Sequence, residues 1–134
     1  MDDINSTLNL LAKDILESDG YILHGAISRF RARAMGGKRL KQSTDVFGVF
    51  DLIALHPFGM PRFIRLTTKA KFQKSTKTID ARLKKHIYCA HIECWVWHED
   101  KGYFVRYVRA EVASMLTEVL RWVPDIIVLH RVVD

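Results

Sequence analysis

The ten-residue run from Val46 to Leu55, V-F-G-V-F-D-L-I-A-L, constrains the fold more than any other part of this chain. It is almost continuously apolar, as expected of a strand that is buried on both faces of a sheet. A strand of this kind needs covering layers on both sides, which predicts an α/β protein. One carboxylate, Asp51, lies inside the run. Burying it is costly unless it is paired, hydrogen-bonded or bound to a metal ion.

Apolar periodicity and turn residues predict the elements on either side of this strand. They are a helix over 3–18, a strand over 21–27, a loop over 28–44, a turn over 56–61, a strand over 62–70, a helix capped by Ser75 or Thr78, a strand pair over 91–98 and 103–109, a helix over 111–122 and a terminal strand or tail over 126–133. The length predicts a single domain over 1–134.

The net charge of +6 is unevenly distributed along the chain. Residues 29–41 hold six basic residues and no acid, and residues 65–85 hold eight basic residues against one acid, Asp80. The remaining chain holds seven basic and fourteen acidic residues. Clustered Lys and Arg displace counterions from nucleic acid, so this segregation suggests a polyanionic partner. The alternative is a pair of solvated basic faces.

No stretch of the sequence has the roughly 18 consecutive apolar residues of a membrane span. The N-terminus, Met1-Asp2-Asp3, is acidic where a signal peptide would be basic. We therefore expect a cytoplasmic, intracellular protein that does not span a membrane.

Two further groups of residues have structural interpretations that outweigh the functional ones. Five side chains between His86 and His98 could suggest zinc, but their spacing does not match the usual ligand pairs, and the two cysteines are expected to be reduced core residues. Trp95 and Trp97 could stack on bases, but large aromatic residues more often fill cores.

The runs S-T-D-V-F-G-V-F-D-L-I-A-L and R-F-I-R-L-T-T-K-A, followed by a basic helix, resemble the core of the PD-(D/E)XK nuclease superfamily over residues 3–98. That superfamily includes restriction endonucleases and archaeal Holliday-junction resolvases. The resemblance implies a restriction endonuclease-like fold, with a mixed sheet flanked by helices and a core that runs helix, three strands, helix, strand. It also implies a Mg²⁺- or Mn²⁺-dependent DNA endonuclease, for which branched DNA such as a Holliday junction is one substrate. In that interpretation Asp51 binds the metal, and Asp45 or Glu17 supplies a second acid.

The third motif of the family departs from its usual form. An acid, an apolar residue and a lysine are normally found there, and the strand aligns Arg65-Leu66-Thr67 with them. Thr67 then occupies the catalytic lysine position. A shift of two residues brings Lys69 into that role on the same strand face, with no acid before it.

The basic residues complete the hypothesis of a DNA endonuclease. The predicted DNA-binding residues are Arg29, Arg31, Arg33, Lys38, Arg39, Lys41, Arg65, Lys71 and Lys74. The resemblance and the apolar tail over 126–133 also predict a homodimer. The alternatives are an inactive DNA-binding or accessory protein on the same scaffold and an adaptor for an acidic protein.

Overall fold

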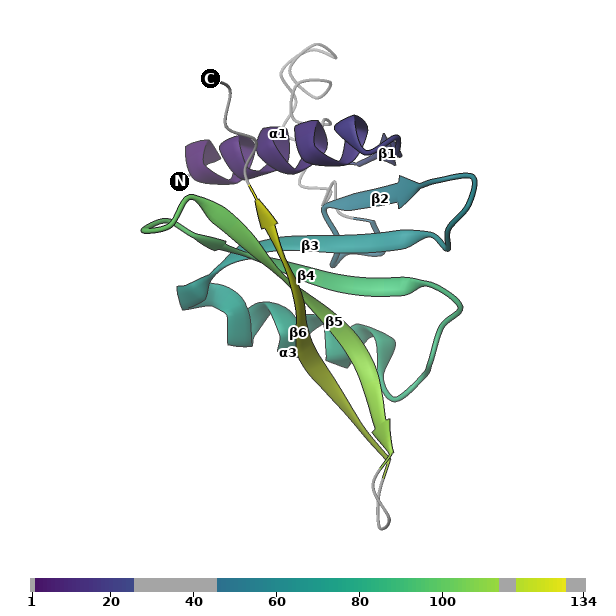
Figure 1. Cartoon of the computed structure of the whole chain (residues 1–134). Coiled ribbons are helices and arrows are strands. Elements are labelled where there is room, and N and C mark those ends of the chain that lie inside the picture. The colour runs from purple at the N-terminus through teal and green to yellow at the C-terminus, as the bar shows by residue number, and fades with distance from the viewer. Residues whose placement is uncertain (1, 26–45, 114–117, 130–134) are drawn as a thin grey trace, which may run out of the picture.

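A six-stranded mixed sheet with one long helix on each face forms the framework of the protein (Figure 1). The computed structural model describes residues 2–25, 46–113 and 118–129, without the side chains of residues 2–6, 111–120 and 126–129. Its elements are α1 (Asp2–Ser18), β1 (Ile22–His24), β2 (Leu52–Leu55), β3 (Arg62–Thr68), the 3₁₀ turn η1 (Lys69–Lys71), α3 (Phe72–Leu83), β4 (His91–His98), β5 (Tyr103–Ala113) and β6 (Glu118–Leu129).

The strands lie in the sheet in the order in which they occur along the chain. β1, β2 and β3 form an antiparallel meander, and α3 then carries the chain across to β4, which is parallel to β3. β5 and β6 continue the sheet in antiparallel fashion. The α/β class predicted from the sequence is confirmed, and neither described helix is both long and apolar enough to cross a membrane.

Each face of the sheet has its own core. On one face, Leu8, Ala12 and Leu16 of α1 recur every four residues and pack against buried residues that include Trp95 and Phe104. Trp95 is 1% exposed, so its predicted place in the core is confirmed.

On the other face, Ile79 and Leu83 of α3 pack with Val49, Phe50 and Ile92. Successive residues of a strand point to opposite faces, so this second core is separated from the first by the sheet itself. The two helices therefore form outer layers on opposite sides of the molecule.

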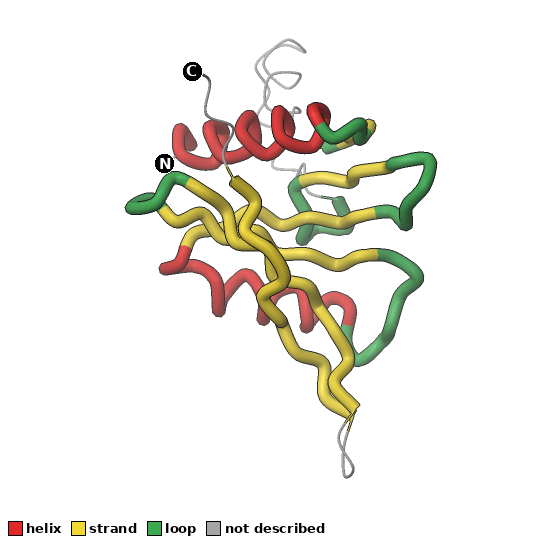
Figure 2. Tube along the Cα trace, in the orientation of Figure 1, coloured by secondary structure: helices red, strands yellow, loops and turns green. Residues whose placement is uncertain are grey.

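The helix predicted over 111–122 is wrong, because the described parts of this region form a β-hairpin. β5 runs to Ala113 and β6 begins at Glu118, and their registers pair Val112 with Val119. The apolar spacing suited a helix, but β-branched residues paired with a neighbouring strand suit a sheet equally well. Figure 2 shows this strand pair extending past the rest of the sheet.

Pro124 lies inside β6 and does not mark the end of a helix, as the sequence had suggested. The register between β5 and β6 shifts at this point, where Arg106 faces Ile126 and Tyr107 faces Pro124. Asp125 is thus the extra residue of a bulge. Proline is tolerated at a bulge and in an edge strand, and β6 is the last strand of the sheet. The predicted terminal strand over 126–133 is confirmed as far as Leu129.

Three other predicted boundaries also change. The strand predicted over 46–55 is shortened to β2, which begins at Leu52. Residues 46–50 form a turn instead, in which the Val46 N–H donates to the Phe50 carbonyl at 2.6 Å. Gly48, with φ of +76°, allows this turn. The strand predicted over 62–70 ends at Thr68, and α3 begins at Phe72, before both of the capping residues predicted for it.

Candidate functional site

Asp51 lies immediately before β2, at the point where the pairing between β2 and β3 begins. Its backbone N–H donates to the Ile64 carbonyl at 2.8 Å, and Leu52 is the register partner of Ile64. The carboxylate accepts a hydrogen bond of 2.7 Å from the Leu66 N–H. The Asp51 side chain therefore takes the place of a backbone carbonyl in the ladder. The Leu66 N–H is in turn the hydrogen-bond partner that the partly buried carboxylate requires.

Arg65 supplies the opposite charge beside this carboxylate. Its Nε lies 3.9 Å from Asp51 Oδ2, and its Nη1 donates to the Val49 carbonyl at 3.4 Å. The Arg65 side chain is 30% exposed and the Asp51 side chain 18%, so water reaches both. The family resemblance aligns Arg65 with the second metal-binding acid, and the structure brings an arginine next to Asp51 at this position.

Thr67 and Lys69, the two candidates for the catalytic lysine position, do not join this pair. Thr67 is buried, and its hydroxyl shares a hydrogen bond of 2.9 Å with Ser75 of α3. Lys69 belongs to η1 beyond the end of β3, where its ammonium donates to Asp100 at 3.4 Å. The strand-face position predicted for Lys69 is therefore wrong, because β3 ends one residue earlier.

Glu17, one candidate for the second acid, lies toward the other end of β2. The Gly20 N–H donates to the Glu17 carbonyl, and a Cβ on Gly20 would meet His56 at 3.3 Å. His56 follows Asp51 by five residues, or about 16 Å at a strand rise of about 3.3 Å per residue. The described backbone thus separates Glu17 from Asp51. Asp45, the other candidate, lies outside the described residues.

The described donors do not fit a magnesium ion, which usually takes several oxygen ligands from carboxylates and substrate. Beside Asp51 the structure places a guanidinium group, which repels a cation. Within residues 2–25, 46–113 and 118–129, no three His, Cys, Asp or Glu side chains are grouped so that they could hold a metal ion.

Cys94 on β4 is the register partner of Arg65, so it lies beside Arg65 in the sheet. It is fully buried, and burial raises the pKa of its thiol to about 12. The thiol is therefore protonated and neither a nucleophile nor a ready metal ligand. Cys94 is a core residue as predicted, whereas Cys89 is exposed, contrary to that prediction.

The predicted DNA-binding residues fall into three places. Lys71 ends η1 and Lys74 lies in the first turn of α3, and both are exposed. Arg65 lies on β3 beside Asp51. Six others are outside the described residues: Arg29, Arg31, Arg33, Lys38, Arg39 and Lys41.

Both ends of the segment that carries those six residues lie next to Asp51. On one side Gly25 approaches so closely that a Cβ there would lie 2.4 Å from the Asp51 carbonyl oxygen. On the other side, backbone hydrogen bonds join Val46 to Phe50, the residue before Asp51. Gly25 and Val46, the described residues on either side of 26–45, therefore both lie close to Asp51.

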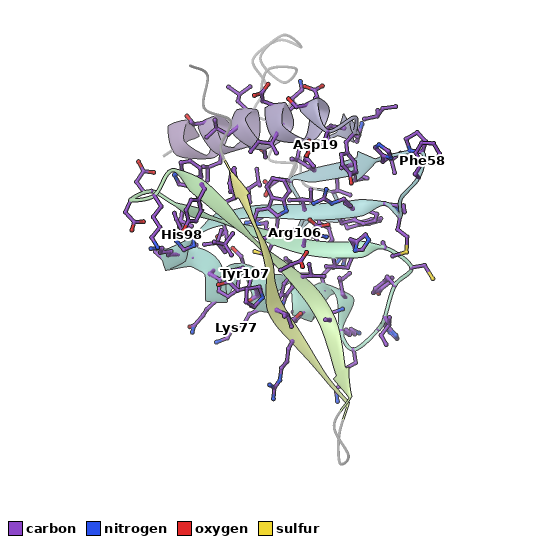
Figure 3. The ribbon with its side chains drawn as sticks, viewed as in Figure 1. Asp19, Phe58, Lys77, His98, Arg106 and Tyr107 are labelled. Atoms are coloured by element: carbon purple, nitrogen blue, oxygen red, sulfur yellow. The ribbon has the colours of Figure 1, made fainter. Side chains whose placement is uncertain are left out.

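Glu93 is a buried charged residue of the same sheet that was not predicted from the sequence. It is fully buried, and its carboxylate accepts two hydrogen bonds of 2.7 Å from Arg62. Arg106 donates two more, and the Trp95 indole donates a fifth at 2.9 Å. Arg106, labelled in Figure 3, also donates to Asp125. The signal was available, because I-E-C-W-V-W places a carboxylate in an apolar strand, as at Asp51.

Comparison with known proteins adds no relative: no family model, no curated protein and no solved structure matches this chain.

Proposed function

We propose that this chain is a DNA-binding protein on a restriction endonuclease-like core, with an Asp51–Arg65 ion pair in place of a complete metal centre. The observation that carries the proposal is the Asp51–Arg65 pair. The aspartate that the resemblance assigns to the metal accepts a backbone hydrogen bond and faces a guanidinium group 3.9 Å away. This arrangement satisfies the Asp51 charge without a metal ion.

The topology supports the choice of scaffold. A helix, an antiparallel meander of three strands, a crossover helix and a parallel fourth strand follow each other in the order that the resemblance implies. Fold alone does not establish function, so the proposal depends on the site and on the distribution of charge. The cluster of six basic residues in the sequence between Gly25 and Val46 supports a polyanionic partner.

A metal-dependent DNA endonuclease is the second candidate, and one observation favours it. The segment between Gly25 and Val46 carries Asp45, so a second acid is joined to the core one residue before Val46. Asp45 beside Asp51 would supply the donor that the described residues lack. Mg²⁺ would then polarise a phosphodiester and activate water when bound.

The experiment that separates the two functions measures binding and cleavage on the same substrates. Branched, linear and single-stranded DNA are incubated with the protein, with and without Mg²⁺ or Mn²⁺, and binding is followed over a range of salt concentrations. We expect binding that weakens steeply with salt and no metal-dependent cutting.

The variant Asp51→Asn decides the meaning of any cutting. Metal-dependent cleavage that disappears in Asp51→Asn, with DNA binding retained, would replace our proposal by the endonuclease. If the wild-type protein binds no DNA at moderate salt, both functions are wrong and an adaptor for an acidic protein is favoured.

A further inference from the structure

We propose that the outward face of α3 is the surface on which the DNA phosphate backbone lies. The proposal rests on the DNA-binding function above and assigns it to one side of the molecule. The basic residues concerned are Lys71, Lys74, Lys77, Arg82, Lys84 and Lys85.

Burial divides α3 cleanly into an inner and an outer side. Ser75, Thr76, Ile79 and Leu83 are buried against the sheet. All six basic residues of the proposed surface are exposed. Figure 3 shows Lys77 pointing away from the sheet. The basic side chains are therefore free to reach a ligand on the outer side without any change in the packing of the helix.

Asp80, the one acid of this helix, accepts hydrogen bonds from Arg109 and Trp122, and the arginine compensates its negative charge. Arg109 Nε donates to Asp80 Oδ1 at 2.9 Å, and the Trp122 indole donates to both carboxylate oxygens at 3.2 Å. Arg109 is 3% exposed and reaches the carboxylate from the inner side, whereas the Asp80 side chain is 43% exposed. The charge of Asp80 is compensated within the fold, and the outer face keeps its excess of positive charge.

Arg109 also fixes the C-terminal end of the helix, where Lys84 and Lys85 lie. Its Nη1 donates to the His86 carbonyl at 3.0 Å, and its Nη2 donates to the Lys84 carbonyl. Lys84 has a φ of +58°, which is uncommon for a residue other than glycine. These bonds hold the strained residue in place, so the basic surface continues past the last helical turn.

The opposite layer carries the opposite charge. Asp14, Glu17 and Asp19 are exposed at the end of α1, where Lys13 is the only basic residue of the helix. Figure 3 shows Asp19 on the far side of the sheet from Lys77. A polyanion is attracted to one layer and repelled by the other, so we infer that it approaches from the α3 side.

The side chains of this surface determine the kind of binding. Lys and Arg contact phosphates without reading the bases unless they enter a groove, and Lys is a flexible point charge. Each phosphate neutralised adds about 0.9 to the slope of log affinity against log salt for duplex DNA. The surface therefore predicts strong salt dependence with little sequence preference.

The test compares two matched charge reversals in the full chain. Lys77→Glu lies on the proposed surface, and Lys13→Glu makes the same change on α1. Affinity for a fluorescent duplex is measured by anisotropy over a salt series, and circular dichroism checks that both variants fold. We expect Lys77→Glu to weaken binding by about tenfold and to lower the salt slope by about one, whereas Lys13→Glu stays within about twofold of wild type.

The other outcomes distinguish failure of the surface from failure of the DNA-binding function. If wild type binds DNA and Lys77→Glu binds equally well, the surface is wrong while the DNA-binding function stands. Equal losses in the two variants would also overturn the surface, because the effect would then follow net charge alone. If wild type does not bind the duplex, the proposed function itself fails. Should Lys77→Glu unfold, Lys74→Gln gives the same comparison with a milder change.

Discussion

Glu93 and Asp51 both pair with arginine, and they differ in how completely their surroundings enclose them. Glu93 is 0% exposed and accepts hydrogen bonds from two guanidinium groups and an indole. The Asp51 side chain is 18% exposed, and the Nε of Arg65 lies 3.9 Å from its Oδ2. The first pairing is closed to water and the second is open to it.

The difference separates a residue held for stability from one that remains accessible to a ligand. A charge that is fully buried is tolerated only when its lone pairs are matched by donors, and Glu93 meets this condition inside the fold. The contact of Asp51 with Arg65 is longer, at 3.9 Å. Asp51 also lies close to Gly25 and Val46, the described residues on either side of 26–45. Stability explains why Glu93 is charged, but it explains only part of the arrangement around Asp51.

The largest expected effect comes from removing the enclosed charge. Glu93→Gln leaves Arg62 and Arg106 without their shared anion in the interior, and we expect the free energy of unfolding to fall by about 3–5 kcal/mol. Urea denaturation followed by fluorescence measures this loss. Glu17→Gln, an exposed change of the same kind on α1, serves as the control and should have little effect. A loss below about 1 kcal/mol at Glu93 would contradict the enclosed geometry.

Acid should weaken the same site through its protonation. Burial by itself raises the pKa of Glu93, but the hydrogen bonds and charges of Arg62 and Arg106 outweigh it and lower the pKa below the ordinary 4.5. A lowered folded-state pKa means that the stabilisation is complete above about pH 4.5 and is lost as the pH falls through the folded value. The stability difference between wild type and Glu93→Gln should therefore shrink in that acidic range. A difference that is constant with pH would contradict this reading.

A smaller effect is expected at the open carboxylate. Asp51→Ala leaves the Leu66 N–H without its acceptor, and we expect a loss of about 1–2 kcal/mol because water can partly replace the carboxylate. Asp51→Asn keeps an oxygen at this place and should lose less. The two variants are compared by the same urea denaturation. If Asn costs as much as Ala, the negative charge matters more than the hydrogen bond to Leu66.

The sequence predicted the parts of the fold that depend on local pattern. The first helix, the strand before the basic segment, the second helix and the hairpin at Gly102 all have periodic or turn signals, and each is present. The region after Val108 was misread because an apolar spacing of three and four and a set of β-branched residues are compatible with either structure. Only the partner strand decides between them.

The site could be predicted less well than the fold, because its contacts depend on register. Asp51 and Arg65 are 14 residues apart in sequence, and they meet only through the pairing of β2 with β3. Among the described residues, the arginine beside Asp51 is Arg65, which lies on the strand of the third motif. Glu93 was overlooked because Arg62 and Arg106 lie 31 and 13 residues away from it.

The smallest expected effect compares two arginines of the same strand directly. Arg62 and Arg65 both lie on β3, and the same substitution to Gln can be made at each. Arg65→Gln should lower the free energy of unfolding by less than about 1 kcal/mol, because its pairing with Asp51 is long and partly solvated. Arg62→Gln should cost several times more, since it leaves Glu93 with half of its guanidinium partners. Urea denaturation of the two variants side by side measures the ratio. Equal losses would mean that the open and the enclosed carboxylate are held alike, and the distinction between them would then fail.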